Sequence, residues 1–472
     1  MQSVIRWGLS LSVIGYAVLH FITYFYPQPL AIRLLAISGI AILIFAIGVH
    51  SVKKMKLPIA LFLIGIGILL INQLPVMQGV ERGVLQMRNM IGLLIIIPII
   101  SWVLKEKPYI ESIVTVAHDL LDTSRKFYFG MVAFTQIISY FLLFGSITMM
   151  YQVVNEVLKD KTGEAWEHFK GTAMLRGFAL SALWVVSIPS FAFVIEVLDA
   201  SLWKAIMQGL AVALIATGMA VLFSIREQKR FGVNITRGLR GEMEEILQQT
   251  SRRKNVSGDA REFFILFVSL FGSIFLLYEI FSLELLVLIP LTIVLWIIVI
   301  YFVAGKMKKL VQEARHYVKE DLQRQVYQLC VMLGAGMMIY ALNQIGFAKL
   351  FVDQLYRLQE AVPFLNILFI LPFIIILLGF VGLGPLTVMV LVGGILETMQ
   401  LSYPPELIVL ALTSGSAISI LLSPLILPLI VLSGMNGMSG LKNGFGYNWK
   451  FAIALFVVVQ IWVQSAALIV SH

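Results

Sequence analysis

The chain has 472 residues, of which 59% are hydrophobic and 13% are charged, so it lacks about half of the charged surface that keeps an ordinary domain soluble. The formal net charge is +9, but the basic residues sit in short loops between apolar segments, as topology signals do, which argues against nucleic acid as a partner. A single cysteine, Cys330, excludes internal disulfides and thiolate metal sites. We therefore expect an all-α integral membrane protein that is embedded in the lipid bilayer.

Uninterrupted apolar segments recur along the whole chain, each long enough to cross roughly 30 Å of hydrocarbon as one helix. The first begins near Trp7 and has no small-residue cleavage site, so we predict a retained helix and not a signal peptide. Two further apolar blocks, 128–198 and 363–436, are broken by Gly, Ser, Thr and Pro. Together these segments predict about 11 transmembrane helices plus two re-entrant hairpins. The uninterrupted spans are 7–26, 30–49, 57–75, 89–104, 203–224, 262–280, 283–304, 330–346 and 451–470.

The distribution of Lys and Arg predicts the orientation of these spans. With the N-terminus in the cytoplasm and the C-terminus outside, 28 of the 35 basic residues lie on the cytoplasmic side, as the positive-inside rule requires. The polar segment 225–261 carries nine of them, so we expect a cytoplasmic loop that contacts anionic lipid headgroups. The bias and the scarcity of cysteine favour a multi-pass protein of a bacterial cell (cytoplasmic) membrane.

Two amphipathic segments precede the broken blocks. Residues 108–124 and 347–360 each carry an apolar stripe at helical spacing. We expect each to lie along the membrane surface as a helix, the first on the cytoplasmic side and the second outside.

The two broken blocks match each other at a nearly constant offset of 238 or 239 residues. Because the surface helices before them lie on opposite sides, the halves are predicted to be inverted repeats, which are typical of secondary transporters. Breaks at matching positions favour a shared polar cavity, since unpaired backbone groups are not tolerated against lipid. The alternative is that the small residues only allow close helix packing. The matched positions are Gly145–Thr148 with Gly384–Thr387, Gly177–Ser181 with Gly415–Ser419, and Pro189 with Pro428.

In the first block, residues 128–158 are too many for one span and predict a hairpin with its tip at Gly145–Thr148. Residues 171–198 are then a crossing helix interrupted around Ser181–Pro189. The opposite order, with the crossing helix first, stays open. Lys159, Lys161 and Lys170 favour the hairpin first, because they then lie inside.

In the second block, residues 363–398 predict a hairpin with its tip at Gly382–Thr387. Residues 405–436 are then a crossing helix interrupted between Gly415 and Pro424. The expected organisation is 1–104, scaffold helices; 105–224, first-repeat surface helix, hairpin, broken helix and closing helix; 225–261, basic loop; 262–346, scaffold helices; 347–472, the second repeat.

The stretches GLGPLTVMVLVGGIL, from Gly382, and TSGSAISILLSPLILPLIVLSG, from Thr413, look like a hairpin tip with its second leg and a following broken helix. In this organisation the chain resembles the ion transporter superfamily, which includes the divalent-anion/sodium symporters. The resemblance implies eleven spans, two opposed hairpins, a mobile transport domain that moves past a scaffold, and a homodimer. The symporters carry Ser-Asn-Thr at the tips, whereas this chain has Gly-Ser-Ile-Thr and Gly-Pro-Leu-Thr.

Small and hydroxyl residues of the broken blocks are the candidate site. Glycines would let a ligand approach the backbone, and hydroxyls would bind it, although each hydroxyl could instead bond to its own helix. Arg176 is a possible charge partner for an anionic substrate, or an interfacial side chain that reaches water. The candidate substrate- or ion-binding residues are Gly145, Ser146, Thr148, Ser181, Ser187, Gly384, Thr387, Gly415, Ser416, Ser419 and Ser423.

The sequence therefore predicts a secondary transporter of a small solute, with an organic anion as the expected substrate and Na+ or H+ as a possible coupling ion. We expect no enzyme activity, no metal and no cofactor, because the six His residues are scattered and neither HExxH nor GxxxxGK[ST] occurs. Two alternatives stay open. One is a lipid-linked or amphiphilic substrate, favoured by the apolar run Leu183–Val186 at the first break. The other is a non-transporting protein that retains a carrier fold.

Overall fold

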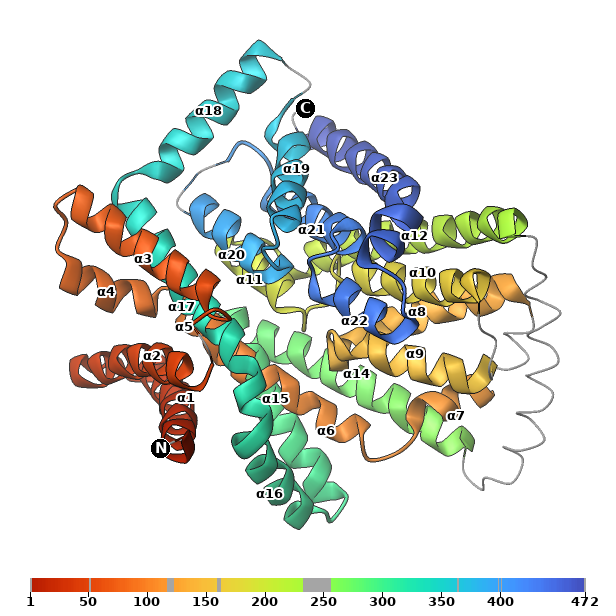
Figure 1. Cartoon of the computed structure of the whole chain (residues 1–472), viewed down its shortest axis with the longest axis horizontal. Coiled ribbons are helices and arrows are strands. Elements are labelled where there is room, and N and C mark those ends of the chain that lie inside the picture. Colours follow the sequence, from red (N-terminus) through yellow and green to blue (C-terminus); the bar gives the residue numbers. More distant parts are fainter. Residues whose placement is uncertain are drawn as a thin grey trace. The chain divides into compact units, whose positions relative to one another are not determined.

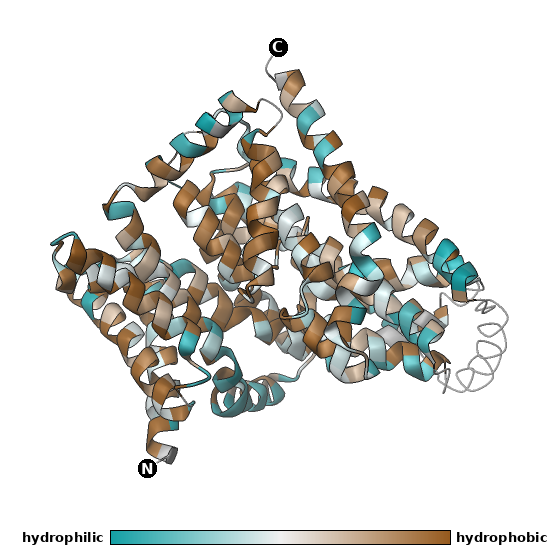
Figure 2. Ribbon diagram, turned by 45° about the horizontal axis from the view of Figure 1, so that its top comes forward, coloured by the Kyte–Doolittle hydropathy of each residue, from teal (hydrophilic) through white to brown (hydrophobic). Residues whose placement is uncertain are grey.

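The computed structural model of the chain describes residues 2–50, 52–116, 123–158, 163–231, 256–362, 365–397, 399 and 401–470. Helices make up 86% of the structure, and the described residues contain no strand. Nine helical stretches in this part of the chain are long and apolar enough to cross a membrane. Figure 2 shows apolar residues over most of the length of these helices. An all-α, multi-pass integral membrane protein is therefore confirmed.

The helices, which are labelled in Figure 1, group into two compact units by their internal contacts. Unit 1 comprises Met1–Val103, Gly272–Leu358 and Val390–Gln400. Its helices are α1 (Gln2–Phe25), α2 (Pro29–Val49), α3 (Lys56–Ile71), α4 (Val76–Leu85), α5 (Arg88–Ile96), the 3₁₀ turn η1 (Ile97–Ile100), α15 (Leu285–Val303), α16 (Met307–His316), the π-helical turn η3 (Tyr317–Asp321) and α17 (Leu322–Gln344).

Helices α3 and α17 approach each other closely inside unit 1. A Cβ atom on Gly334 would lie 2.6 Å from the carbonyl oxygen of Pro58, and one on Gly65 would lie 2.8 Å from backbone atoms of Met337. Small residues at such crossings bring helix backbones together where no hydrophobic effect drives association.

Unit 2 comprises Leu104–Phe271, Gln359–Met389 and Leu401–His472. Its helices are α7 (Tyr109–Val116), α8 (Ser124–Leu142), α9 (Gly145–Leu158), α10 (Glu164–Ser181), α11 (Pro189–Val197), α12 (Leu202–Phe231), α19 (Ile367–Phe380), α21 (Pro405–Leu422), α22 (Leu427–Asn436), the π-helical turn η4 (Lys442–Gly446) and α23 (Tyr447–Val470). The boundary between the units passes through four more helices, which are α6 (Ser101–Leu104), α14 (Val256–Phe281), α18 (Phe347–Ala361) and α20 (Pro385–Leu396).

Several spans differ in length from those expected. α12 continues to Phe231, seven residues beyond its expected end, and α14 already begins at Val256. Both ends of the segment 225–261 are therefore helical, and its middle, 232–255, lies outside the described residues. α3 has 16 residues, fewer than expected for a full span. Pro98 lies in the 3₁₀ turn that interrupts the fourth span, because proline lacks the N–H group that an α-helix needs.

The amphipathic segments form helices where the structure describes them. α18 covers the expected 347–360, and α7 covers the first half of 108–124, of which 117–122 lie outside the described residues. The hydroxyl of Tyr109 on α7 donates a 2.7 Å hydrogen bond to Glu262 on α14, and Lys107 pairs with the same carboxylate. These bonds attach α7 to α14 within unit 2.

Candidate functional site

Two helices of the first broken block, α8 and α9, form a helical hairpin. α8 and α9 are joined at Leu143 and Phe144, and Leu143 has a positive φ of 49°. The turn precedes the expected tip, so Gly145–Thr148 form the first turn of α9. The buried hydroxyl of Ser146 donates to the carbonyl oxygen of Leu143 over 2.7 Å and lies 2.9 Å from the Ser139 hydroxyl. Ser146 thus stabilises the turn, and Thr148 is half-buried one helical turn from the start of α9.

The second hairpin turns at the expected place. α19 ends at Phe380 and α20 begins at Pro385. Gly382 has a φ of 95°, which residues other than glycine rarely adopt. Gly384 closes the turn with open space beside its Cα, and Thr387 is buried in the first turn of α20.

Both crossing helices are broken, and each resumes with a proline among its first two residues, Pro189 in α11 and Pro428 in α22. α10 ends at Ser181 and α11 begins at Pro189, as expected. In the second repeat α21 is continuous through Gly415 and ends at Leu422, so the break is at 423–426 and the expected start of the interruption was wrong. α21 stays helical there because Gly415 is packed against α19. A Cβ atom on Gly415 would lie 2.8 Å from the Cα atom of Pro372.

The matched glycine of the first repeat has the same role. A Cβ atom on Gly177 would lie 2.7 Å from the carbonyl oxygen of Val132 on α8. In both repeats the crossing helix therefore packs its glycine on the first leg of the hairpin, and the packing interpretation of Gly177 and Gly415 is supported.

A serine in each break is bonded to the end of that same hairpin leg. The hydroxyl of Ser187 donates to the carbonyl oxygen of Tyr140 over 2.5 Å, and the hydroxyl of Ser423 donates to that of Gly379 over 2.9 Å. The two acceptors are 239 residues apart in the sequence, close to the repeat offset. Both serines are buried, and each donates to a carbonyl group in the last turn of the hairpin leg. The carbonyl oxygen of Gly379 also accepts from the backbone N–H of Gly382 over 3.1 Å.

The remaining hydroxyls of the site differ between the repeats. Ser181 is buried and donates to the carbonyl oxygen of Phe178 in its own helix over 2.6 Å. Ser416 and Ser419 on α21 are also buried, but neither hydroxyl has a hydrogen-bond partner in the described part of the chain. The hydroxyl of Ser419 faces Gly379. A Cβ atom added to Gly379 would lie 1.8 Å from the hydroxyl oxygen of Ser419. An unpaired buried hydroxyl costs free energy, which marks this pair for a ligand or an ordered water.

Arg176 is fully buried and is paired with protein groups. Its guanidinium donates to Glu227 over 2.8 Å, to the hydroxyl of Tyr128 over 3.0 Å and to the side-chain oxygen of Asn448 over 2.9 Å. Its charge also lies 4.8 Å from the ring centre of Phe451. The four partners come from α8, α12 and α23, so Arg176 joins the broken helix α10 to three neighbours. It does not reach outside water, and in this conformation Glu227 neutralises it.

Glu227 is the residue that sequence reasoning missed. It was assigned to a polar loop because the span before it was expected to end at residue 224, but α12 continues past it. Besides Arg176, it lies 3.8 Å from the imidazole of His168. The sequence did carry a signal for this pair: Glu227 lies one helical turn beyond the expected end of its apolar span, and Arg176 lies inside another apolar segment.

The apolar run at the first break is packed inside unit 2. Leu183, Val185 and Val186 are fully buried, and the indole N–H of Trp184 donates to the side chain of Gln136 over 3.0 Å. No group of three His, Cys, Asp or Glu side chains that could hold a metal ion occurs in the described ranges. Neither a protein-family model nor a curated protein matches this chain.

Proposed function

We propose that this chain is a secondary active transporter that moves a small solute, an organic anion, by ion-coupled, elevator-type alternating access. One observation carries the proposal: in two hairpin-and-broken-helix modules, matched in sequence, a serine in the break bonds to a carbonyl group on the first hairpin leg, Ser187 to Tyr140 and Ser423 to Gly379. Paired discontinuous helices of this kind line substrate sites in carriers, since broken backbone is tolerated in a membrane only around a cavity or inside protein.

Ser416 and Ser419 are the substrate donors of this proposal. They lie three residues apart on α21, buried and without a partner among the described residues. Hydroxyl donors suit a carboxylate oxygen, and the N-termini of α11 and α22 beyond the breaks carry partial positive charge that favours an anion.

Arg176 and Glu227 have a different role in the proposal. Because the arginine is already neutralised, it adds no net charge to the substrate site. The pair instead holds the broken helix to α12, and a proton or Na+ that competes for Glu227 would loosen that contact. This makes Glu227 the candidate coupling residue.

The division of the chain into two units supports the elevator mechanism. Both crossing helices and the first hairpin belong to unit 2, whereas α1 to α5, α15 and α17 belong to unit 1. We propose unit 2 as the transport domain and unit 1 as the scaffold. Eleven spans, re-entrant hairpins, a cytoplasmic N-terminus, an external C-terminus, a location in the cell membrane and a homodimer complete the proposal.

Thermal unfolding of the purified protein in detergent tests the substrate class. A panel of organic anions, each with and without sodium, is expected to contain one that raises the unfolding temperature. Ser416→Ala and Ser419→Ala should reduce that rise. Ser414→Ala is the matched control, because its buried hydroxyl bonds within α21, to the carbonyl oxygen of Ala411 over 2.7 Å. No response to any anion would favour an amphiphilic substrate or a protein that does not transport.

A further inference from the structure

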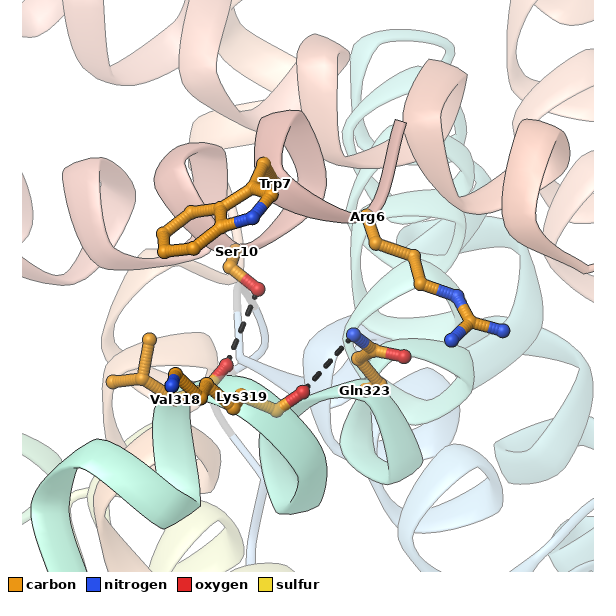
Figure 3. A pocket seen from close by; sticks show the side chains of 6 residues that line it. All are labelled: Arg6, Trp7, Ser10, Val318, Lys319 and Gln323. Atoms are coloured by element: carbon orange, nitrogen blue, oxygen red, sulfur yellow. Dashed lines mark hydrogen bonds between the residues drawn. The ribbon is translucent and has the colours of Figure 1, made fainter. Parts of the chain in front are cut away.

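A pocket in unit 1 lies apart from the proposed transport site. It has a volume of about 310 Å³ and opens between the start of α1 and the π-helical turn η3 with the first turn of α17. Figure 3 shows Trp7 and Ser10 on one side, facing Val318 and Gln323 on the other. The pocket is lined by Arg6, Trp7, Ser10, Val318, Lys319 and Gln323.

Two cations of the pocket are available to a ligand. Arg6 and Lys319 are exposed, and neither forms an ion pair with a carboxylate in the described ranges. The acids that follow Lys319 have other neighbours: Glu320 lies 3.8 Å from His316, and Asp321 lies 3.6 Å from Arg324. The pocket therefore carries uncompensated positive charge, which suits an anion.

Two hydrogen bonds hold residues that line the pocket in place. The hydroxyl of Ser10, which is 5% exposed, donates to the carbonyl oxygen of Val318 over 3.2 Å, and the amide of Gln323 donates to that of Lys319 over 3.1 Å, as dashed lines in Figure 3 mark. The first of these bonds joins α1 to η3, so the two cations are presented by elements that are attached to each other. Short π-helical turns inside helices are frequent at functional sites.

The position of α1 indicates the level at which the pocket lies in the membrane. The candidate span begins at Val4, so Arg6 and Trp7 lie in its first two turns, where a spanning helix leaves water. Trp7 is 65% exposed. Tryptophan is enriched at the level of lipid headgroups, because its ring is apolar and its N–H group is polar.

We propose that this pocket binds the phosphate of an anionic phospholipid headgroup. Arg6 would bind two phosphate oxygens through its planar guanidinium, Lys319 would add a point charge, and Trp7 would lie beside the glycerol region. Basic pockets between transmembrane helices bind anionic headgroups in this way. The inference uses only unit 1 and the membrane placement of α1, so it stands whether or not the chain transports.

The test compares three probes on the purified full-length protein in detergent: phosphatidylglycerol, phosphatidylcholine and inorganic phosphate. Phosphatidylglycerol is expected to raise the unfolding temperature and to be retained in native mass spectra. Each of Arg6→Gln and Lys319→Gln should weaken its binding about fivefold, and the double variant about thirtyfold. High salt should weaken binding to the wild type as well.

Lys308→Gln is the matched control, since it removes an exposed charge from the neighbouring α16 without lining the pocket. It should bind phosphatidylglycerol like the wild type. An equal loss in Lys308→Gln and in the double variant would overturn the proposal, because binding would then follow total charge. A response to inorganic phosphate with none to phosphatidylglycerol would also overturn it.

Discussion

The hydroxyl of Ser187, in the break of the first crossing helix, lies 2.5 Å from the carbonyl oxygen of Tyr140 on α8. Ser423, in the second break, forms the same bond with Gly379 on α19, over 2.9 Å. Each bond ties the broken segment to the end of the first hairpin leg of its own repeat. The two broken blocks are therefore alike in this hydrogen bond as well as at their matched sequence positions.

Removing either serine hydroxyl should destabilise the protein by a similar amount. Ser187→Ala and Ser423→Ala each lose a buried hydrogen bond between elements and leave a carbonyl without that partner, which costs about 1–2 kcal/mol. Thermal unfolding in detergent measures the loss. Ser414→Ala loses only a bond within its own helix and should cost less. Equal values for all three variants would contradict the proposed role of the breaks.

Gly415→Ala should be strongly destabilising. The added methyl group would lie 2.8 Å from backbone atoms of Pro372, so α21 and α19 must move apart, at a cost of about 1–3 kcal/mol. Gly218→Ala on α12 is the control, because no described atom lies within 4 Å of the place that its methyl group would take. Alanine there should be neutral or stabilising, since it favours helix. If Gly415→Ala unfolds at the wild-type temperature, the close packing of the two helices is wrong.

The Arg176–Glu227 pair should show strong coupling. Arg176→Gln leaves the partly buried carboxylate of Glu227 without this partner, and Glu227→Gln leaves the fully buried charge of Arg176; each is expected to cost about 3 kcal/mol. The double variant should lose at least about 1 kcal/mol less than the sum of the single losses. The surface pair His316–Glu320, with side chains 54% and 61% exposed, is the reference, and Glu320→Gln should cost under about 1 kcal/mol. Additive losses at Arg176 and Glu227 would mean that the two groups do not interact.

Transport should depend on Ser416 and Ser419 more than on Ser181. The first two hydroxyls are free for a ligand in the described structure, whereas that of Ser181 is bonded to Phe178 in its own helix. Ser416→Ala and Ser419→Ala are expected to lower uptake at least tenfold, which is about 1.4 kcal/mol of ligand interaction, with unchanged abundance in the membrane. Quantitative blotting of the membrane fraction checks abundance. Loss of abundance in parallel with uptake would assign packing roles to these serines.

Much of the architecture was predictable because proline and glycine act locally. Pro189 marks the start of the helix after the first break, and Gly382 marks the second hairpin turn, since each residue imposes or permits a particular backbone conformation. The onset of the second break was not predictable in this way. Gly415 and Ser416 weaken an isolated helix, but packing against α19 keeps α21 continuous to Leu422.

The partners of the site residues were beyond sequence reasoning. Arg176 and Glu227 are 51 residues apart, and nothing in the spacing indicates that α10 and α12 bring them together. Likewise, Ser181 and Ser419 occupy matched positions in the repeat, yet only the first is bonded to its own helix. Such differences depend on side-chain rotamers and neighbours, which a shared motif does not determine.

Uptake into proteoliposomes tests the central claim most directly. The purified protein is reconstituted, labelled organic anions are added outside, and a sodium or proton gradient is imposed or collapsed. The account predicts that at least one anion accumulates only while a gradient exists, and that Ser419→Ala reduces this accumulation while Ser414→Ala does not. Accumulation that ignores both gradients, or the absence of any uptake by protein that binds none of the anions, would contradict ion-coupled transport.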